Sequence, residues 1–199
     1  MRASDHRFSN WATVYEDDGL SRLLGRLGEH AVRSLDLNRS DRFLDVGCGS
    51  GAAVRRSASA VRLAVGVDEC QAMIERARKL ANPPSRARFL VGDVHHLPFD
   101  DGAFTALACT VASRHFADLD GAIGEMERVL APGGRLCLID LFSDPAPRRR
   151  TRLTRRQPYA SVFRAMRDAG LVVAHRAVHL TPFGPYFVCL ATESRPVDR

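Results

Sequence analysis

The sequence predicts a single doubly wound α/β domain, and three features of its 199 residues predict it. From residue 41 onward, short apolar runs rich in β-branched residues alternate with helical stretches, which is typical of β-α units around a parallel sheet. A glycine-rich turn follows the first of these runs. Two apolar runs close the chain on either side of the short turn 182–185, which predicts an antiparallel hairpin. We therefore expect a seven-stranded, mostly parallel sheet with an antiparallel edge.

The N-terminal segment 8–37 precedes the sheet. Its apolar residues recur at three- and four-residue spacings, which predicts one or two amphipathic helices carrying Leu20, Leu23, Leu24, Leu27, Ala31 and Leu35. We expect residues 1–40 to form a helical lid over a core at 41–142.

The core strands are expected where apolar runs end in glycine, aspartate or a polar turn. They fall at 42–47, 62–68, 87–92, 103–109 and 134–141, and the helices between them include 51–59, 70–81 and 119–130. Pro132, Gly133 and Gly134 are expected to stop the last helix and turn the chain into the fifth strand, because proline cannot continue the hydrogen-bond ladder.

An arginine-rich loop is expected at 143–157, followed by a C-terminal helix and strand pair at 158–192. The helix lies near 158–169 and ends at Gly170, and the strands lie near 171–179 and 184–192. Residues 148–156 hold six arginines, as many as the net charge of +6, so the rest of the chain is neutral overall. Because the excess charge is local, it favours a solvated loop over a nucleic-acid surface.

Composition excludes several classes of protein. No apolar run is long enough to span a bilayer, and the polar N-terminal segment lacks the apolar core of a secretory signal. We therefore expect a soluble cytoplasmic protein. The five cysteines are odd in number and show no C-x-x-C spacing, which predicts reduced thiols and neither a disulfide framework nor a metal site.

The most informative segment is LDVGCGSG at 44–51, a strand that ends in a glycine-rich turn before a helix. Glycine lets the backbone approach a ligand at the carboxyl end of a strand, where open α/β sheets bind ligands. A bare G-x-G-x-G also fits a tight turn without a ligand. Asp68 closes the second strand, where a carboxylate can accept both hydroxyls of a ribose, and Asp93 follows the third strand as an acceptor for an exocyclic amino group. Either aspartate alone fits a surface or capping residue, but the ordered set indicates a nucleoside site.

These motifs resemble those of the class I S-adenosylmethionine-dependent methyltransferases, in particular the small-molecule group related to the ubiquinone and menaquinone biosynthesis enzymes. The resemblance covers about residues 8–142 and depends on FLDVGCGSG, VGVDECQAMIERAR, FLVGDVHHLPFDDGAF and MERVLAPGGRLCLIDL. It implies S-adenosyl-L-methionine as cofactor, no metal requirement, and a cofactor-binding set of Asp45, Gly47, Cys48, Gly49, Gly51, Asp68, Glu69, Met73, Asp93, Val94 and Thr110. By this resemblance Asp68 would hold the ribose and Met73 would pack on the adenine. Asp93 and the Val94 amide would read the adenine edge.

The implied function is methyl transfer to an O, N or C atom of a small-molecule acceptor. An electrophilic sulfonium methyl must meet its nucleophile in line, so positioning in a water-poor pocket supplies much of the acceleration. His115 is the candidate catalytic base, because the family often has histidine beside the substrate there, although a locally packed histidine fits equally well. His95 and His96 are expected to be mainly structural. Candidate substrate contacts in the lid and the arginine-rich loop are Trp11, Tyr15 and Arg148.

The sequence departs from the family pattern at Thr105, where aspartate is usual in F-D-x-V, and we expect a loosened strand-end hydrogen bond there.

A dinucleotide oxidoreductase is a rival function, but its G-x-G-x-x-G fingerprint is missing because the third glycine falls one residue early. A nucleic-acid adenine methyltransferase would resemble its relatives in an N-P-P-aromatic motif where this sequence reads ACTVAS. A cofactor-binding protein without methyl transfer, and a methyltransferase acting on RNA or protein, stay open as alternatives.

Overall fold

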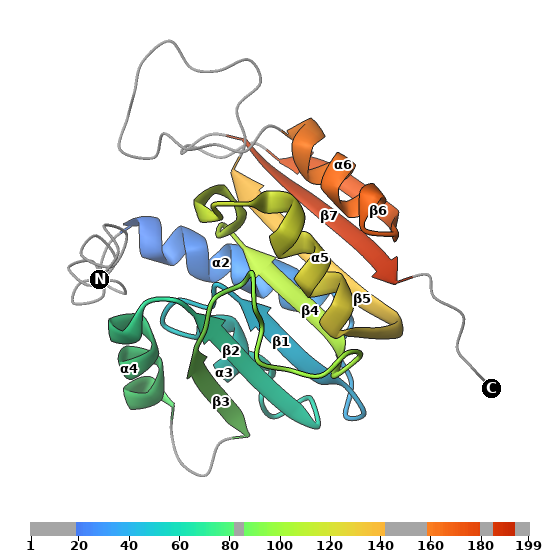
Figure 1. Cartoon of the computed structure of the whole chain (residues 1–199). Helices are drawn as coiled ribbons and strands as arrows, with labels where there is room; N and C mark the ends of the chain where they lie inside the picture. The colour runs from blue at the N-terminus through green and yellow to red at the C-terminus, as the bar shows by residue number, and fades with distance from the viewer. Residues whose placement is uncertain (1–18, 82–85, 142–158, 180–184, 194–199) are drawn as a thin grey trace.

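The computed structural model describes residues 19–81, 86–141, 159–179 and 185–193. Figure 1 shows the elements, which in chain order are α2 (Gly19–Ser34), β1 (Arg42–Val46), α3 (Ala52–Ser57), β2 (Leu63–Asp68), α4 (Gln71–Leu80), β3 (Ala87–Val91), β4 (Phe104–Thr110), the 3₁₀ helix η1 (Ser113–His115), α5 (Leu119–Val129), β5 (Leu130–Leu141), α6 (Tyr159–Asp168), β6 (Leu171–His179) and β7 (Tyr186–Glu193). The arginine-rich loop and the helix expected before residue 19 lie outside the described residues. Among the helices described, none is long and apolar enough to cross a membrane.

The strands form one seven-stranded sheet in the order β3-β2-β1-β4-β5-β7-β6. Strands β1 to β5 pair in parallel, whereas β7 pairs antiparallel with both β5 and β6. The predicted doubly wound sheet with an antiparallel edge hairpin is therefore confirmed. Strand order reverses between β1 and β4, and open α/β sheets bind ligands at the carboxyl ends of the strands beside such a switch point.

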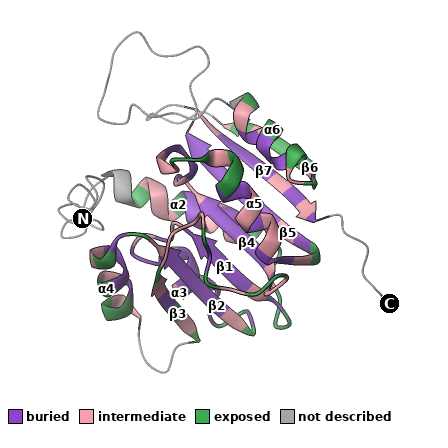
Figure 2. Ribbon diagram, in the orientation of Figure 1, coloured by how far each residue is buried: buried purple, intermediate pink, exposed green. Residues whose placement is uncertain are grey.

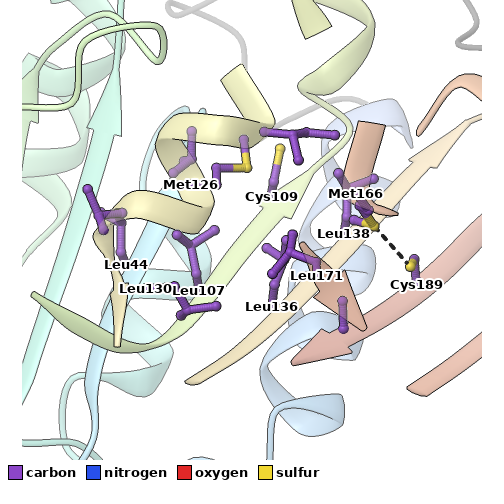
Figure 3. Packing of buried hydrophobic residues seen from close by; sticks show 14 of the residues in the cluster. Leu44, Leu107, Cys109, Met126, Leu130, Leu136, Leu138, Met166, Leu171 and Cys189 are labelled. Atoms are coloured by element: carbon purple, nitrogen blue, oxygen red, sulfur yellow. Dashed lines mark hydrogen bonds between the residues drawn. The ribbon is translucent and has the colours of Figure 1, made fainter. Parts of the chain in front are cut away.

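Helices cover both faces of the sheet. One apolar cluster joins α5 and α6 to the sheet through Ile123, Met126, Val162 and Met166. The other joins α2, α3 and α4 to the opposite face through Leu27, Ala31, Val54, Ile74 and Ala77. The central strands are mostly apolar and largely buried, as Figure 2 shows in purple. Figure 3 shows the first cluster, where Leu107 and Leu138 lie beneath Met126 and Met166. This packing fixes the carboxyl ends of β1, β2 and β4 relative to one another.

Thr105 forms hydrogen bonds at the edge of the sheet where β1 and β4 begin, opposite the carboxyl ends of these strands. The loosened hydrogen bond expected at Thr105 is not found. The Thr105 hydroxyl donates to Asp41 Oδ1 at 2.7 Å and accepts from the backbone N–H of Arg42 at 3.1 Å. Arg135 donates to the other Asp41 oxygen at 2.9 Å. Burial would raise the pKa of Asp41, but these partners and the Asn38 backbone lower it below its ordinary value. Threonine thus preserves the strand-end contact by a different route.

The start of β5 is a second correction. Helix α5 ends at Val129 and β5 begins at Leu130, so Pro132 lies inside the strand instead of before it. The pairing of β4 with β5 is irregular between Phe104 and Ala106, and Pro132 and Gly133 are exposed. Such a bulge accommodates a proline at its exposed side without the loss of a central ladder bond.

Candidate functional site

Two adjoining cavities open at the carboxyl edge of the sheet. The first has a volume of about 250 Å³ and is lined by Leu24, Val46, Gly47, Gly49, Val67, Asp68, Glu69, Met73, Gly92, Asp93, Val94, His95, Thr110, Val111, Ala112, Arg114, His115, Phe116 and Ala117. The second has a volume of about 480 Å³ and is lined by Arg22, Leu24, Gly25, Gly28, Asp45, Gly47, Cys48, Ser50, Ala52, Ala53, Arg55, Arg56 and Thr110. Leu24, Gly47 and Thr110 line both cavities, so one extended ligand could reach from one cavity into the other.

The glycine-rich turn after β1 forms the boundary between the cavities. Gly47, Gly49 and Gly51 have φ of 71°, 53° and 79°, a left-handed region that side chains disfavour. A Cβ on Gly47 would lie 2.5 Å from the Cβ of Ala112 in the loop after β4. Gly51 lines neither cavity, and a Cβ there would collide with the ring of Phe89. Gly47 and Gly49 therefore leave room at the site, whereas Gly51 leaves room for the core.

Asp68, at the end of β2, holds the turn and also faces the first cavity. Its Oδ2 accepts the backbone N–H of Gly49 at 2.8 Å, and its Oδ1 accepts the backbone N–H of Cys70 at 2.9 Å. Burial raises the pKa of Asp68, although these two hydrogen bonds oppose the rise. A carboxylate has about four acceptor positions, so each oxygen can take one further hydrogen bond from a ligand.

Asp45 lies near the end of β1 and lines the second cavity while only 4% exposed. Burial raises its pKa to about 8, and the negative charge of Asp68 adds to this rise. The Asp45 side chain makes no hydrogen bond or ion pair with any residue in the described part of the chain. Because a buried carboxylate without a partner is costly, this side chain favours a cationic ligand group in the second cavity.

The adenine side of the predicted site is built from β3 and α4. Asp93 and Val94 follow β3 and line the first cavity. Glu69, which directly follows β2, and the buried Met73 of α4 line it as well. Asp93 Oδ1 accepts the backbone N–H of His95 at 2.9 Å, and the His95 ring nitrogen Nδ1 lies 2.6 Å from the same oxygen. Four carboxylates, including the two aspartates above, therefore surround these cavities.

The loop after β4 forms the facing wall. Val111 has φ of 55°, an uncommon and strained value for a β-branched residue, and there the chain turns into η1. The Thr110 hydroxyl oxygen is buried and has no hydrogen-bond partner among the residues that the structure describes. Arg114 Nε donates to His115 Nε2 at 3.0 Å. Because a guanidinium only donates, this ring nitrogen is unprotonated, and it could serve as a base only after that contact breaks.

Asp140 of β5 holds the loop after β4 through hydrogen bonds. It is fully buried and accepts the Ser113 hydroxyl at 2.5 Å and the backbone N–H of Arg114 at 3.2 Å. Burial raises the pKa of Asp140, while the Arg114 charge and these hydrogen bonds oppose the rise. The anchored loop therefore has a fixed conformation opposite the glycine-rich turn.

The predicted site residues are brought together with few exceptions. Ten of the cofactor-binding set line one or both cavities: Asp45, Gly47, Cys48, Gly49, Asp68, Glu69, Met73, Asp93, Val94 and Thr110. His115 also lines the first cavity. Trp11, Tyr15 and Arg148 lie outside the described residues. The sequence did not single out Arg114 as a pocket residue, and it gave His95 only a structural role, because no local spacing marks either of them.

The doubly wound fold and the cavities at its switch point define an α/β protein with a candidate ligand site at the carboxyl ends of its strands. Residues 44–138 match the family model described as a methyltransferase domain. The Bacillus subtilis relative "Uncharacterized methyltransferase YcgJ" is 31% identical over 142 residues, which cover 70% of this chain and 56% of the relative. The demethylmenaquinone methyltransferase of Thermus thermophilus is 39% identical over 107 residues, 52% of this chain and 49% of the relative.

A solved structure shows the same fold. The geranyl diphosphate C-methyltransferase of Streptomyces coelicolor, bound to Mg²⁺, geranyl diphosphate and S-adenosyl-L-homocysteine, superimposes with a TM-score of 0.73 at 20% identity, covering 87% of this chain and 79% of that chain. Residues 44–138 therefore match a methyltransferase domain, and this part of the chain is similar to a quinone methyltransferase. The chain spans about half the length of the curated relatives it matches.

Proposed function

We propose that this chain transfers the methyl group of S-adenosyl-L-methionine to an O, N or C atom of a small molecule in the cytoplasm. The observation that carries the proposal is the pair of adjoining cavities that meet at Gly47, with Asp68 on one side and Asp45 on the other. We take residues 1–199 as one domain, with residues 1–40 as its lid.

The residues present fit this cofactor. Asp68 offers one remaining acceptor position on each oxygen for the two ribose hydroxyls. Asp93 and the Val94 amide, which line the same cavity, would face the adenine edge. Met73 offers an apolar surface to the adenine ring. Asp45 would hold the amino group of the methionine part in the second cavity, and the buried Thr110 hydroxyl would gain a partner there.

The charge of the site supports this cofactor over a dinucleotide. Asp68, Glu69 and Asp93 bring carboxyl groups to the first cavity and Asp45 brings one to the second, where a cationic ligand group would favour its charged form. A sulfonium and an ammonium group are attracted by carboxylates, whereas a pyrophosphate is repelled by them. Dinucleotide folds also place the pyrophosphate at a helix N-terminus, and α3 here begins only after the left-handed Gly51 and has six residues.

The chain's own residues would accelerate transfer mainly by positioning. When bound, the cofactor supplies an electrophilic methyl group, and the loop anchored by Asp140 would hold the acceptor in line with it. Val111, Ala112, Phe116 and Ala117 give that wall an apolar lining, which excludes water. His115 would take a proton from the acceptor at Nε2 once Arg114 releases that nitrogen.

A small-molecule acceptor is supported by the names of relatives, since demethylmenaquinone is the acceptor named for the Thermus enzyme. The local position of the positive charge supports the same view, because the residues outside 148–156 are neutral overall.

The proposal is tested with S-adenosyl-L-methionine labelled in the methyl group and a cell lysate separated into small-molecule, protein and RNA fractions. We expect label in the small-molecule fraction, dependent on the protein and lost in Asp68→Ala. Label in the protein or RNA fraction alone would move the acceptor to that class. Cofactor binding without any transfer would support a binding protein of the same fold.

A further inference from the structure

His95 lies in the first cavity wall, two residues beyond Asp93, with its side chain only 20% exposed. Its backbone N–H donates to Asp93 Oδ1, so this oxygen acts as an acceptor. The ring nitrogen Nδ1 lies 2.6 Å from the same oxygen and therefore carries the proton of that hydrogen bond. Two donors from one residue thus fix the orientation of the Asp93 carboxylate.

The other ring nitrogen of His95 reaches a different element. Nε2 lies 3.0 Å from the carbonyl oxygen and 3.2 Å from the backbone N of Asp118, and in the neutral ring with the proton on Nδ1 it accepts that N–H. Asp118 is the N-cap of α5, where its side chain accepts the backbone N–H of Gly121 at 3.1 Å. The His95 ring also meets the Phe116 ring edge to face, with centroids 6.3 Å apart.

His95 therefore joins the two loops that wall the first cavity. One wall follows β3 and contains Asp93, and the other follows β4 and contains Phe116. A side chain held at both ring nitrogens cannot rotate without loss of a hydrogen bond, so the ring sets the position of Asp93 relative to α5. A hydrogen bond of this kind is the usual device that orients a ligand-binding carboxylate.

We propose that His95 is a positioning residue that holds Asp93 for recognition of the adenine amino group, and that this contact sets the preference for adenine over hypoxanthine. The inference rests on the proposed function, because it assumes that Asp93 faces the base of the cofactor. An amino group donates to a carboxylate, whereas the carbonyl oxygen of hypoxanthine would face it as a second acceptor. A carboxylate fixed in place penalises that mismatch, and one free to rotate avoids it.

The probes are S-adenosyl-L-homocysteine and its hypoxanthine analogue S-inosyl-L-homocysteine, titrated by calorimetry into the full chain and three variants. His95→Asn keeps a donor near the position of Nδ1, His95→Gln places its amide near Nε2 instead, and His95→Phe keeps a ring without either nitrogen. His96→Asn is the matched control, because His96 is an exposed neighbour outside both cavities.

We expect wild type and His96→Asn to prefer the adenine probe. In His95→Phe and His95→Gln the ratio of the two dissociation constants should fall by about tenfold, the effect of one lost hydrogen bond, whereas His95→Asn should stay within about threefold of wild type. A merely structural role would weaken both probes alike and leave the ratio unchanged, and that result in His95→Gln and His95→Phe would overturn the proposal. If wild type binds neither probe, the proposed function itself fails. If His95→Phe does not fold, His95→Gln carries the same test.

Discussion

Gly47 and Ala112 approach each other so closely that a Cβ on Gly47 would lie 2.5 Å from the Cβ of Ala112. This contact joins the turn after β1 to the loop after β4, and both cavities meet there. Gly47→Ala should therefore force these loops apart. It should weaken the binding of S-adenosyl-L-homocysteine by about tenfold or more and lower the melting temperature, with strain and overpacking each costing about 1 to 2 kcal/mol.

Gly133→Ala is the matched control for this variant. Gly133 has nearly the same left-handed φ, 72° against 71°, but a Cβ there has no neighbour within 4 Å. Differential scanning calorimetry should show the strain alone in Gly133→Ala, with unchanged ligand affinity. Equal losses of stability and affinity in the two variants would mean that the contact with Ala112 has no role in the site.

A second prediction concerns the pH dependence of stability at Asp45. Burial raises the pKa of this carboxyl from 3.8 to about 8, so between these values the folded protein holds a proton that the unfolded chain has released. Stability contributed by Asp45 is then full at low pH and falls as the pH rises through this window. In Asp45→Asn the side chain has a similar shape and cannot ionise.

Urea denaturation at pH 5 and at pH 8 measures this effect. We expect the free energy of unfolding to fall by roughly 3 kcal/mol more in wild type than in Asp45→Asn over this range. Asp100→Asn should show the same pH profile as wild type, since Asp100 is exposed and lies outside both cavities. Parallel pH profiles for wild type and Asp45→Asn would contradict the raised pKa.

The arginine-rich segment gives a third prediction, which rests on the sequence because residues 142–158 lie outside the described part of the chain. Replacement of Arg148, Arg149, Arg150 and Arg152 by serine should leave the affinity for S-adenosyl-L-homocysteine unchanged. If the segment is a flap that recognises an anionic acceptor, KM for the acceptor should rise with a smaller effect on kcat, and a solvated linker predicts no kinetic change.

RNA binding by the arginine-rich segment is the result that would contradict both of these interpretations. A cluster of cations binds polyanions without sequence preference, and its affinity falls steeply with salt. Salt-resistant and sequence-selective RNA binding by wild type, absent from the serine variant, would overturn both readings of the segment and favour a macromolecular acceptor.

The fold could be predicted well because its strands are signalled locally. Strands β1 and β2 are mostly apolar runs that end in the glycine-rich turn and in Asp68, and the predicted bounds of β6 agree with those observed. The start of β5 was not predicted correctly, because the pairing of Leu130 with Phe104 of β4 extends β5 through Pro132. Proline signals a break locally, but its exposed position in a bulge removes that penalty.

The site was predictable where one motif supplies the residue, as at Gly47, Asp68 and Asp93. It was not predictable where two distant loops supply the contact. His95 reaches Asp118 across 23 positions, and away from the site, at the opposite edge of the sheet, Thr105 of β4 likewise finds its partner Asp41 64 positions away. These contacts depend on the order of the strands in the sheet, which no local spacing encodes.

The central claim is that Asp68 holds the ribose of the cofactor, and calorimetric titration of S-adenosyl-L-homocysteine tests it most directly. Asp68 offers each oxygen for one ribose hydroxyl, so Asp68→Ala should weaken binding by about 100-fold or more, while Asp100→Ala should bind as wild type. Circular dichroism of Asp68→Ala should show the wild-type fold, although loss of the Gly49 contact should lower its melting temperature. Wild-type binding with one site per chain, lost in Asp68→Ala, is the predicted result. Absence of binding by wild type, or binding by Asp68→Ala within about threefold of wild type, would contradict the account.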